Sequence, residues 1–466
     1  MKKTGLILFV ALLLAIVALP IVGGYKARQT LEQLVNYTNN EAPGSTTWQA
    51  YDKGWFNTTA ILNVNLLNLL GMPSSATQSD PMIVPLELSL QHGPVFWAEG
   101  FGLGWFKGRW FLNDQQDSWI KEHVQVEGSG PFLTSHFKMS ISGLVTFYER
   151  SLPFSVLTED GVFSLAGFEG QGSYSLAREL KYKGGFHSAS ILDEKGRMAV
   201  EGLTIELTSD LGRMQGDYAV PGGAHFDVKK MSIINEGDTL FTAENLAIKS
   251  IFTLSDPNPN IANMEFKASV QNMQTLDNKI TDGVFDLTLE RISVAFFNQY
   301  MALLQQTNEE GQSQVDTAKL LSLVNRELLP LGPKIHLRKV GFISAEGQLQ
   351  VDGELSVPPS DAATQSNLFA VLGVIRASLN AKIDKPLAQK LAQQSAANTL
   401  DEKMFGTGTV LNDDERTARI NEMASTQLDM LVLQNLIRDA GDRFETEMTY
   451  KDGVTVVNGQ PIPLPF

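Results

Sequence analysis

Apolar and polar residues alternate with a period of two along most of the chain, from about residue 48 to residue 291. The alternation is clearest in six segments, at residues 62–66, 86–90, 137–141, 203–207, 246–248 and 285–289. One apolar and one polar face is typical of antiparallel strands that are covered on one side. Glycine-rich turn signals such as Pro221-Gly222-Gly223 separate the segments. The pattern predicts a β-rich region over residues 46–291 without a long helix.

After residue 291 the period becomes helical and then mixed. Helices are predicted at 292–306, 317–329, 365–396 and 416–438, strands at 334–344 and 347–357, and a terminal hairpin at 444–450 and 454–457. The expected fold class is therefore α+β, dominated by long curved or extended antiparallel sheets. Several helices belong to its C-terminal third.

Residues 5–24 form an apolar run without a single charge, preceded by Lys2 and Lys3. Twenty helical residues extend about 30 Å, the thickness of the hydrocarbon core of a bilayer. We therefore expect residues 1–24 to be a signal anchor, a single transmembrane helix, with cleavage near Gly24 as the alternative. Lys2 and Lys3 favour a cytoplasmic N-terminus, whereas Lys26 and Arg28 favour the opposite orientation.

The expected organisation follows from this anchor. Residues 25–45 would be a stalk helix and linker, 46–291 a β-rich domain, and 292–466 a mixed α/β domain ending in a hairpin. No second apolar run follows, so the chain is predicted to cross a membrane once, with the bulk of the chain exported from the cytoplasm.

Charge and cysteine content narrow the classes of partner. The formal net charge is −15 and the pI about 4.9, which argues against nucleic acid as a partner. The chain has no cysteine and hence neither a disulfide framework nor a thiolate metal site. The expected partners are a membrane, through residues 5–24, and a lipid or another protein.

No motif in the chain predicts catalysis, a cofactor or a metal. The six histidines have no spacing that would gather them on one helix face, and a Gly-x-Ser-x-Gly elbow is absent. Lys121-Glu122-His123 is interpreted as a solvated loop, Gly170-Gln171-Gly172-Ser173 as a turn, and Asp413-Asp414-Glu415 as a helix start. We therefore predict no catalytic, cofactor-binding or metal-binding residues and a non-enzymatic protein.

Residues 96–111 concentrate aromatic residues and glycines. Two interpretations remain open. The segment is either a core-filling strand pair with glycine kinks or an apolar surface that meets lipid or a partner.

Three segments in the same order carry a family resemblance: Tyr51-Asp52-Lys53-Gly54-Trp55-Phe56, then His92-Gly93-Pro94, then Asp452-Gly453 with Asn458-Gly459. This layout resembles the bacterial YdgA family, a domain of unknown function with an N-terminal membrane segment. The resemblance implies a Gram-negative envelope protein, held in the inner membrane by a single span with the bulk of the chain in the periplasm. It supplies no catalytic residues. We interpret these motif residues as structural, with Gly54 in a turn, Trp55 and Phe56 in the core, and Asp452-Gly453 in a hairpin.

Three functional hypotheses follow. The first is an anchored, non-enzymatic envelope protein that handles lipids or maintains the envelope, broadly similar in pattern to the AsmA-type proteins. The second is a structural protein that binds an envelope partner. The third is a periplasmic hydrolase with dispersed catalytic residues.

Overall fold

The computed structural model describes residues 22–462 except 23, 26, 30, 33, 34, 37, 40–42, 66–82, 97–101, 113–123, 159, 160, 217, 277, 310–316, 360–372 and 405–411. Its described strands pair antiparallel, which confirms the predicted dominance of antiparallel sheet. Within these residues no helix has the length and apolarity needed to cross a membrane. The predicted anchor, residues 5–24, lies almost entirely outside the described residues.

The chain divides into two compact units. Unit 1 contains residues 1–212 and 233–237, and unit 2 contains residues 213–232 and 238–466. The boundary predicted at residue 291 falls inside unit 2, where β18 (Lys279–Ser293) pairs with β19 (Lys334–Ser344).

Unit 1 is built on an antiparallel sheet whose neighbouring strands follow the chain. Its order is β1 (Thr46–Lys53), β2 (Asn57–Asn65), β3 (Ile83–His92), β6 (Phe106–Leu112), β8 (Leu133–Met139), β9 (Val145–Ser151), β12 (Phe168–Tyr174), β13 (Glu179–Leu192) and β14 (Gly196–Asp210). Three further strands, β7 (Val124–Val126), β10 (Phe154–Thr158) and β11 (Gly161–Leu165), join β13 through β11. The short strands β4 (Val95–Phe96) and β5 (Gly102–Leu103) pair with each other.

An N-terminal helical segment covers one side of this sheet. The described residues between 24 and 39 are helical. Ala27 and Leu31 pack against Leu90, Phe106 and other buried side chains, and Val35 packs against strand β2. Burying this helix face against the sheet gives unit 1 its core.

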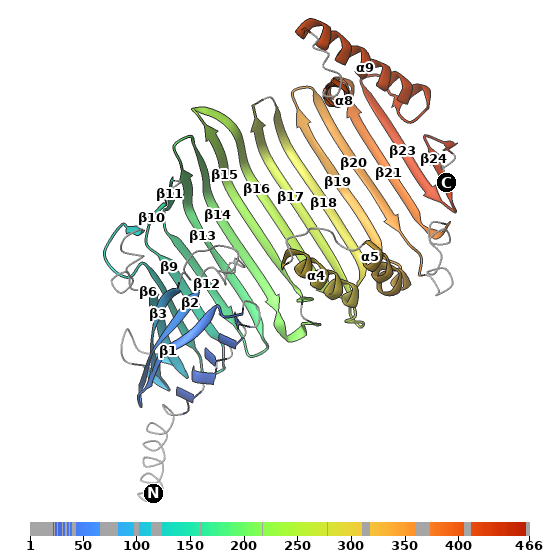
Figure 1. The fold of residues 1–466 in the computed structure, drawn as a ribbon. Coiled ribbons are helices and arrows are strands. Elements are labelled where there is room, and N and C mark those ends of the chain that lie inside the picture. Colours follow the sequence, from blue (N-terminus) through green and yellow to red (C-terminus); the bar gives the residue numbers. More distant parts are fainter. Residues whose placement is uncertain are drawn as a thin grey trace, which may run out of the picture. The chain divides into compact units, whose positions relative to one another are not determined.

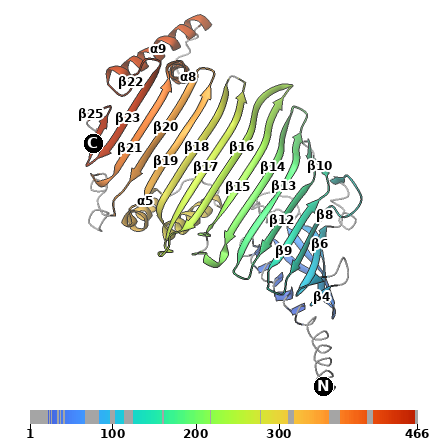
Figure 2. The same ribbon diagram turned by 180° about the vertical axis from the view of Figure 1, so that it is seen from behind.

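Unit 2 places helices at both ends of its antiparallel strands (Figures 1 and 2). Its described strands are β15 (Gly222–Asn235), β16 (Asp238–Leu254), β17 (Ile261–Thr275), β18, β19, β20 (Gly347–Ser356), β21 (Arg376–Asp384), β22 (Arg438–Asp439), β23 (Arg443–Lys451), β24 (Val454–Val457) and β25 (Gln460–Ile462). At one end lie α4 (Val294–Glu309) and α5 (Thr317–Leu323), the latter followed by the short turns Val324–Leu328 and Leu329–Leu331. At the other end lie α8 (Lys385–Met404) and α9 (Asp413–Leu433).

Several sequence predictions agree with these elements. The strands at 334–344 and 347–357, the helices near 292 and 416, and the terminal hairpin are all present. The acidic residues Asp413, Asp414 and Glu415 do begin α9, where Asn412 and Glu415 form a reciprocal capping box.

The helix predicted at residues 365–396 was wrong over part of its length. Residues 376–384 form β21 and not a helix, and α8 begins only at Lys385. The apolar residues of this segment can be placed on one face of a helix, which suggested the prediction. Ala377, Leu379 and Ala381 also alternate with polar residues, and the structure follows this period of two. The part of the predicted helix at residues 365–372 lies outside the described residues.

The predicted turn at residues 170–173 was also wrong, because these residues form the middle of β12. A Cβ on Gly172 would meet Phe147 of the neighbouring strand β9, and one on Gly184 would lie 2.7 Å from the Tyr182 hydroxyl. These glycines therefore make room for aromatic rings on the sheet rather than a chain reversal.

Candidate functional site

The central feature of unit 2 is an apolar face that crosses six paired strands. Strand register places its side chains in rows, because directly paired residues point to the same side of a sheet. The members are Met264, Phe266 and Ala268 (β17); Phe285, Leu287 and Leu289 (β18); Ile335, Leu337 and Val340 (β19); Leu349, Val351 and Leu355 (β20); Ala377, Leu379, Ala381 and Ile383 (β21); and Phe444, Met448 and Tyr450 (β23). Gly353 and Thr446 complete the rows, which carry no charged residue.

This apolar face of unit 2 is only partly covered. Of the members named above, Phe444 alone is buried, and Ile335 and Leu355 are exposed. The buried clusters among the described residues of unit 2 lie instead at the strand ends and between helices. One joins α4 to the ends of β16 and β17, one surrounds Leu329 and Val357, and one joins α8 to α9. An apolar sheet face of this extent without a packed cover is a candidate binding surface.

The opposite face of the same strands is polar. Lys267 Nζ lies 3.9 Å from Asp286 Oδ2, and Lys382 Nζ lies 3.9 Å from Glu445 Oε1. The ring nitrogens of His336 lie 3.6 Å from Glu290 Oε1 and 3.6 Å from Glu354 Oε2. Water can solvate this face, so the sheet of unit 2 is amphipathic.

Unit 1 contains an open hollow of about 670 Å³ on the polar side of its sheet. Four lysines line it: Lys107, Lys138, Lys181 and Lys183, from β6, β8 and β13. Lys183 forms an ion pair of 2.6 Å with Glu206. His136 and Glu206 also line the hollow, but β9, β12 and β13 lie between their strands, so they are about 19 Å apart at roughly 4.8 Å per strand. Chemically the hollow suits a hydrated anion better than acid–base catalysis.

A carboxylic acid with a perturbed pKa lies on the other side of this sheet. The Tyr182 hydroxyl donates a hydrogen bond of 3.2 Å to Glu149 Oε2. Partial burial raises the pKa of Glu149, opposed by this hydrogen bond, and burial also raises the pKa of Tyr182. No motif in the sequence marks this pair, because its residues come from β9 and β13, which are separated by β12.

The first two resemblance motifs meet at one end of unit 1. His92 is buried, and its ring hydrogen-bonds to Thr58 Oγ1 at 2.9 Å and to the Trp55 carbonyl at 3.2 Å. Gly24 lies against the same ring, where an added Cβ would stand 2.6 Å from His92 Cε1. Burial lowers the pKa of His92, against a smaller raising effect of the bond to Trp55. His92 thereby ties the end of the apolar run to the β1–β2 turn.

The other residues of these two motifs lie on β1, in the β1–β2 turn and in the loop that follows β3. Gly54 donates its backbone N–H to Asn57 within the β1–β2 turn, and Tyr51 on β1 packs against the core. The backbone N–H of Gly93 donates a hydrogen bond to the Trp105 carbonyl, and the peptide bond between Gly93 and Pro94 is cis.

Trp55 and Phe56 do not occupy the core that the sequence predicted for them. Their side chains are 52% and 59% exposed in the β1–β2 turn. In contrast, Phe96 and Phe106 of the aromatic and glycine-rich segment are buried, which supports the core-filling interpretation for those two residues. Leu103 of that segment is exposed, and residues 97–101 lie outside the described part of the chain.

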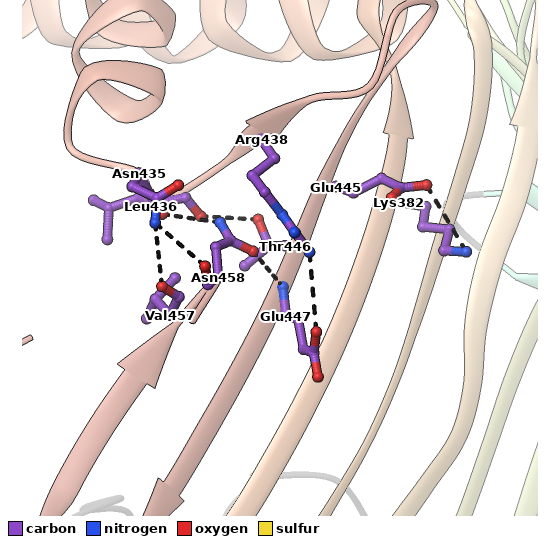
Figure 3. A network of polar contacts seen from close by, with 9 residues as sticks. All are labelled: Lys382, Asn435, Leu436, Arg438, Glu445, Thr446, Glu447, Val457 and Asn458. Carbon is purple, nitrogen blue, oxygen red and sulfur yellow. Dashed lines mark hydrogen bonds and ion pairs between the residues drawn. The ribbon is translucent and has the colours of Figure 1, made fainter. Parts of the chain in front are cut away.

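The third motif closes the C-terminal edge of unit 2, as Figure 3 shows. Asn458 has φ +52° and accepts a hydrogen bond from the Glu447 amide through Oδ1, while its Nδ2 donates to the Asn435 carbonyl. Asn435 in turn donates to the Val457 carbonyl at 3.4 Å. Asp452-Gly453 forms the β23–β24 turn, and Gly459 forms the next turn with φ +83°. The contribution of Asn435 has no signal in the sequence.

Among the described residues, no group of three or more His, Asp or Glu side chains is placed to hold a metal ion. Lys121-Glu122-His123 lies outside these residues.

Comparison with known families places the chain in one group. A family described as "Bacterial protein of unknown function (DUF945)" matches residues 1–465, and the chain belongs to it. This family is compatible with the YdgA resemblance, whose name stays a prediction. No curated protein and no solved structure matches the chain.

Proposed function

For this member of a bacterial family without a known function, we propose a membrane-anchored envelope protein that binds the acyl chains of lipids. The binding surface is the apolar face of unit 2. The anchor is the uncharged run at residues 5–24, and the protein performs no chemistry on the lipid.

The observation that carries this proposal is the partly open apolar face on six paired strands. Five steps between six strands, at about 4.8 Å each, span about 24 Å. This exceeds the ~15 Å of one leaflet of a bilayer, half of its ~30 Å hydrocarbon core. A whole acyl chain therefore fits across the rows.

The chemistry of the face also favours an acyl chain. Its rows are mostly aliphatic and lack charged groups, so the surface offers area and few directional contacts. Such a surface suits a flexible, featureless ligand. A protein partner is the alternative occupant, corresponding to an interaction protein of the envelope.

Photo-crosslinking tests the proposal directly. The full chain is reconstituted into vesicles that contain a phospholipid with a diazirine in its acyl chain, and crosslinked peptides are identified by mass spectrometry. We expect crosslinks in β18–β21 as well as in residues 5–24. Crosslinks confined to residues 5–24 would contradict acyl-chain binding by unit 2.

A pair of matched variants locates the site. Leu337→Gln with Leu379→Gln places two amides in one row of the apolar face, and Ser378→Gln with Asn380→Gln changes the polar face of β21. Losing apolar contact from two leucines predicts at least a tenfold drop in crosslinking of unit 2, whereas the polar-face variant keeps it. Equal crosslinking of both variants would rule out this face.

A further inference from the structure

The end of unit 1 at which residue 24 enters the fold carries exposed apolar side chains on successive strand connections. Register places these connections together: Asn57 pairs with Gln91, His92 with Phe106, Phe106 with Met139, Met139 with Val145, Val145 with Tyr174, and Tyr174 with Leu180. The turns next to these pairs therefore lie at the same end of the sheet.

We name these side chains the apolar rim. Its members are Trp55 and Phe56 between β1 and β2, Leu103 between β3 and β6, Ile141 and Leu144 between β8 and β9, and Leu176 between β12 and β13. All are large, apolar and exposed, with Leu176 reaching 71% exposure. Neighbouring turns also touch, because Leu176 occupies the space where a Cβ on Gly143 would lie.

The rim differs in charge from the rest of the chain. Asp and Glu outnumber Lys and Arg by 52 to 37 in the whole sequence. Yet the turns at residues 54–56, 140–144 and 175–178 contain neither Asp nor Glu, and the β3–β6 connection at residues 93–105 contains one acid, Glu99. At the opposite end of the sheet, the β13–β14 turn contains Asp193-Glu194-Lys195, next to the exposed Ile191 and Leu192. An apolar surface with few acidic residues is compatible with the anionic surface of a bacterial bilayer.

The uncharged run joins the fold at the rim. Gly24, its last residue, packs against the His92 ring, which also binds the Trp55 carbonyl. The helical segment then leads away from this end, with Ala27 beside Phe106 and Val35 beside Leu62. Val22 and Tyr25, on either side of Gly24 along the chain, are exposed. A bilayer that holds residues 5–24 would therefore lie next to Trp55 and Phe56.

We propose that the apolar rim is a lipid-contact surface that seats unit 1 on the membrane at the bilayer interface. Tryptophan is enriched at this depth of membranes, because one end of its ring is apolar and the other carries a polar N–H group. Phe56 and the aliphatic side chains of the rim add apolar area. This contact explains why Trp55 and Phe56 are exposed in a turn that His92 holds in place. The inference rests on the proposed anchor, but not on acyl-chain binding by unit 2.

The absence of native cysteine permits a direct test with single-cysteine variants of the full chain. Phe56→Cys and Leu176→Cys report on the rim, Leu12→Cys reports on the apolar run, and Leu192→Cys is the matched control at the opposite end of the sheet. Leu192 is 52% exposed against 59% for Phe56. Each variant is labelled with an environment-sensitive fluorophore and reconstituted into vesicles of phosphatidylethanolamine and phosphatidylglycerol.

Two quenchers then distinguish a probe that contacts lipid from a probe that contacts water. We expect a lipid-attached quencher to dim the probes at residues 12, 56 and 176 several-fold more than the probe at 192, and iodide to do the reverse. If lipid quenches the probe at residue 12 and only iodide quenches the probes at 56 and 176, the rim does not contact lipid, although the anchor does. If iodide also quenches the probe at residue 12, both the rim contact and the anchor are contradicted.

Discussion

Strands β2, β3, β6 and β8 of unit 1 bury their apolar side, whereas the sheet of unit 2 leaves its own apolar side partly open, although both are built from strands with the same period-two alternation. In unit 1 Leu90 and Phe106 are buried beneath the N-terminal helical segment. In unit 2 the equivalent central positions, such as Leu337 and Leu379, are neither buried nor fully exposed. The alternation therefore fixes which side of a strand is apolar, but not what covers it.

The difference has a physical source in the helices that each unit offers. The segment at residues 24–39 presents Ala27, Leu31 and Val35 on one side and lies along the sheet of unit 1. The described helices of unit 2 use their apolar residues at the strand ends or on each other, as Ala392 and Ala424 do between α8 and α9. A sheet face left without such a partner keeps its driving force for burial and is available to a ligand.

The largest expected effect comes from truncating one buried ring in unit 1. Phe106→Ala removes a ring that is 2% exposed and packs edge to face on Phe137, which predicts a loss of about 3–5 kcal/mol in the free energy of unfolding of unit 1. All six tryptophans of the chain lie between residues 48 and 119, so tryptophan fluorescence in a urea titration reports on unit 1 alone.

The matched change in unit 2 is Leu379→Ala on its apolar face. Because this side chain is only partly buried, we expect a cost of about 1 kcal/mol or less. Hydrogen exchange of the amides in β20 and β21 measures this effect. A cost as large as that of Phe106→Ala would mean that the apolar face is covered like a core, and the contrast between the units would disappear.

An effect smaller than that of Phe106→Ala is expected from filling the space beneath the aromatic rings of unit 1. In Gly172→Ala the new methyl group would collide with Phe147 and approach the Lys181 carbonyl to 2.7 Å, which predicts a cost of about 1–3 kcal/mol. Gly373→Ala in unit 2 is the control, since a Cβ there meets no atom of the described residues within 4 Å. Adding Phe147→Leu should recover part of the loss of Gly172→Ala. Equal stability of the two alanine variants would show that Gly172 is not needed for ring packing.

The strands and the terminal hairpin were predictable because alternation and turn residues are local properties of the sequence. Residues 376–384 were not, because Leu379 and Ile383 also have helical spacing, and only pairing with β20 and β23 decides between the two periods. Gly170 and Gly172 suggested a turn because glycine is common in turns. In the structure they leave room for aromatic rings from neighbouring strands, and the local sequence does not contain these rings.

The candidate surfaces were less predictable than the elements. The apolar positions of unit 2 were visible in part, but whether a helix would cover them depends on tertiary packing. Trp55 and Phe56 were expected in the core because large aromatic residues are usually buried. Their exposure follows from the position of the turn at the end of the sheet where Gly24 enters.

The smallest expected effect is a pH dependence that is confined to unit 1. Burial lowers the pKa of His92 below its ordinary value near 6.5, so the unfolded chain binds this proton at a higher pH than the folded chain does. The stabilising contribution of neutral His92 is therefore complete above about pH 6.5 and decreases as the pH falls toward the pKa of the folded state. Urea titrations followed by tryptophan fluorescence from pH 7.5 down to about 5 should show the stability of unit 1 decreasing. His92→Gln should start from a lower stability, because the hydrogen bonds to Thr58 and Trp55 are changed. Its stability should also depend less on pH. Parallel pH profiles for the two proteins would show that His92 does not control this dependence, and the acid sensitivity of unit 1 would then come from other groups.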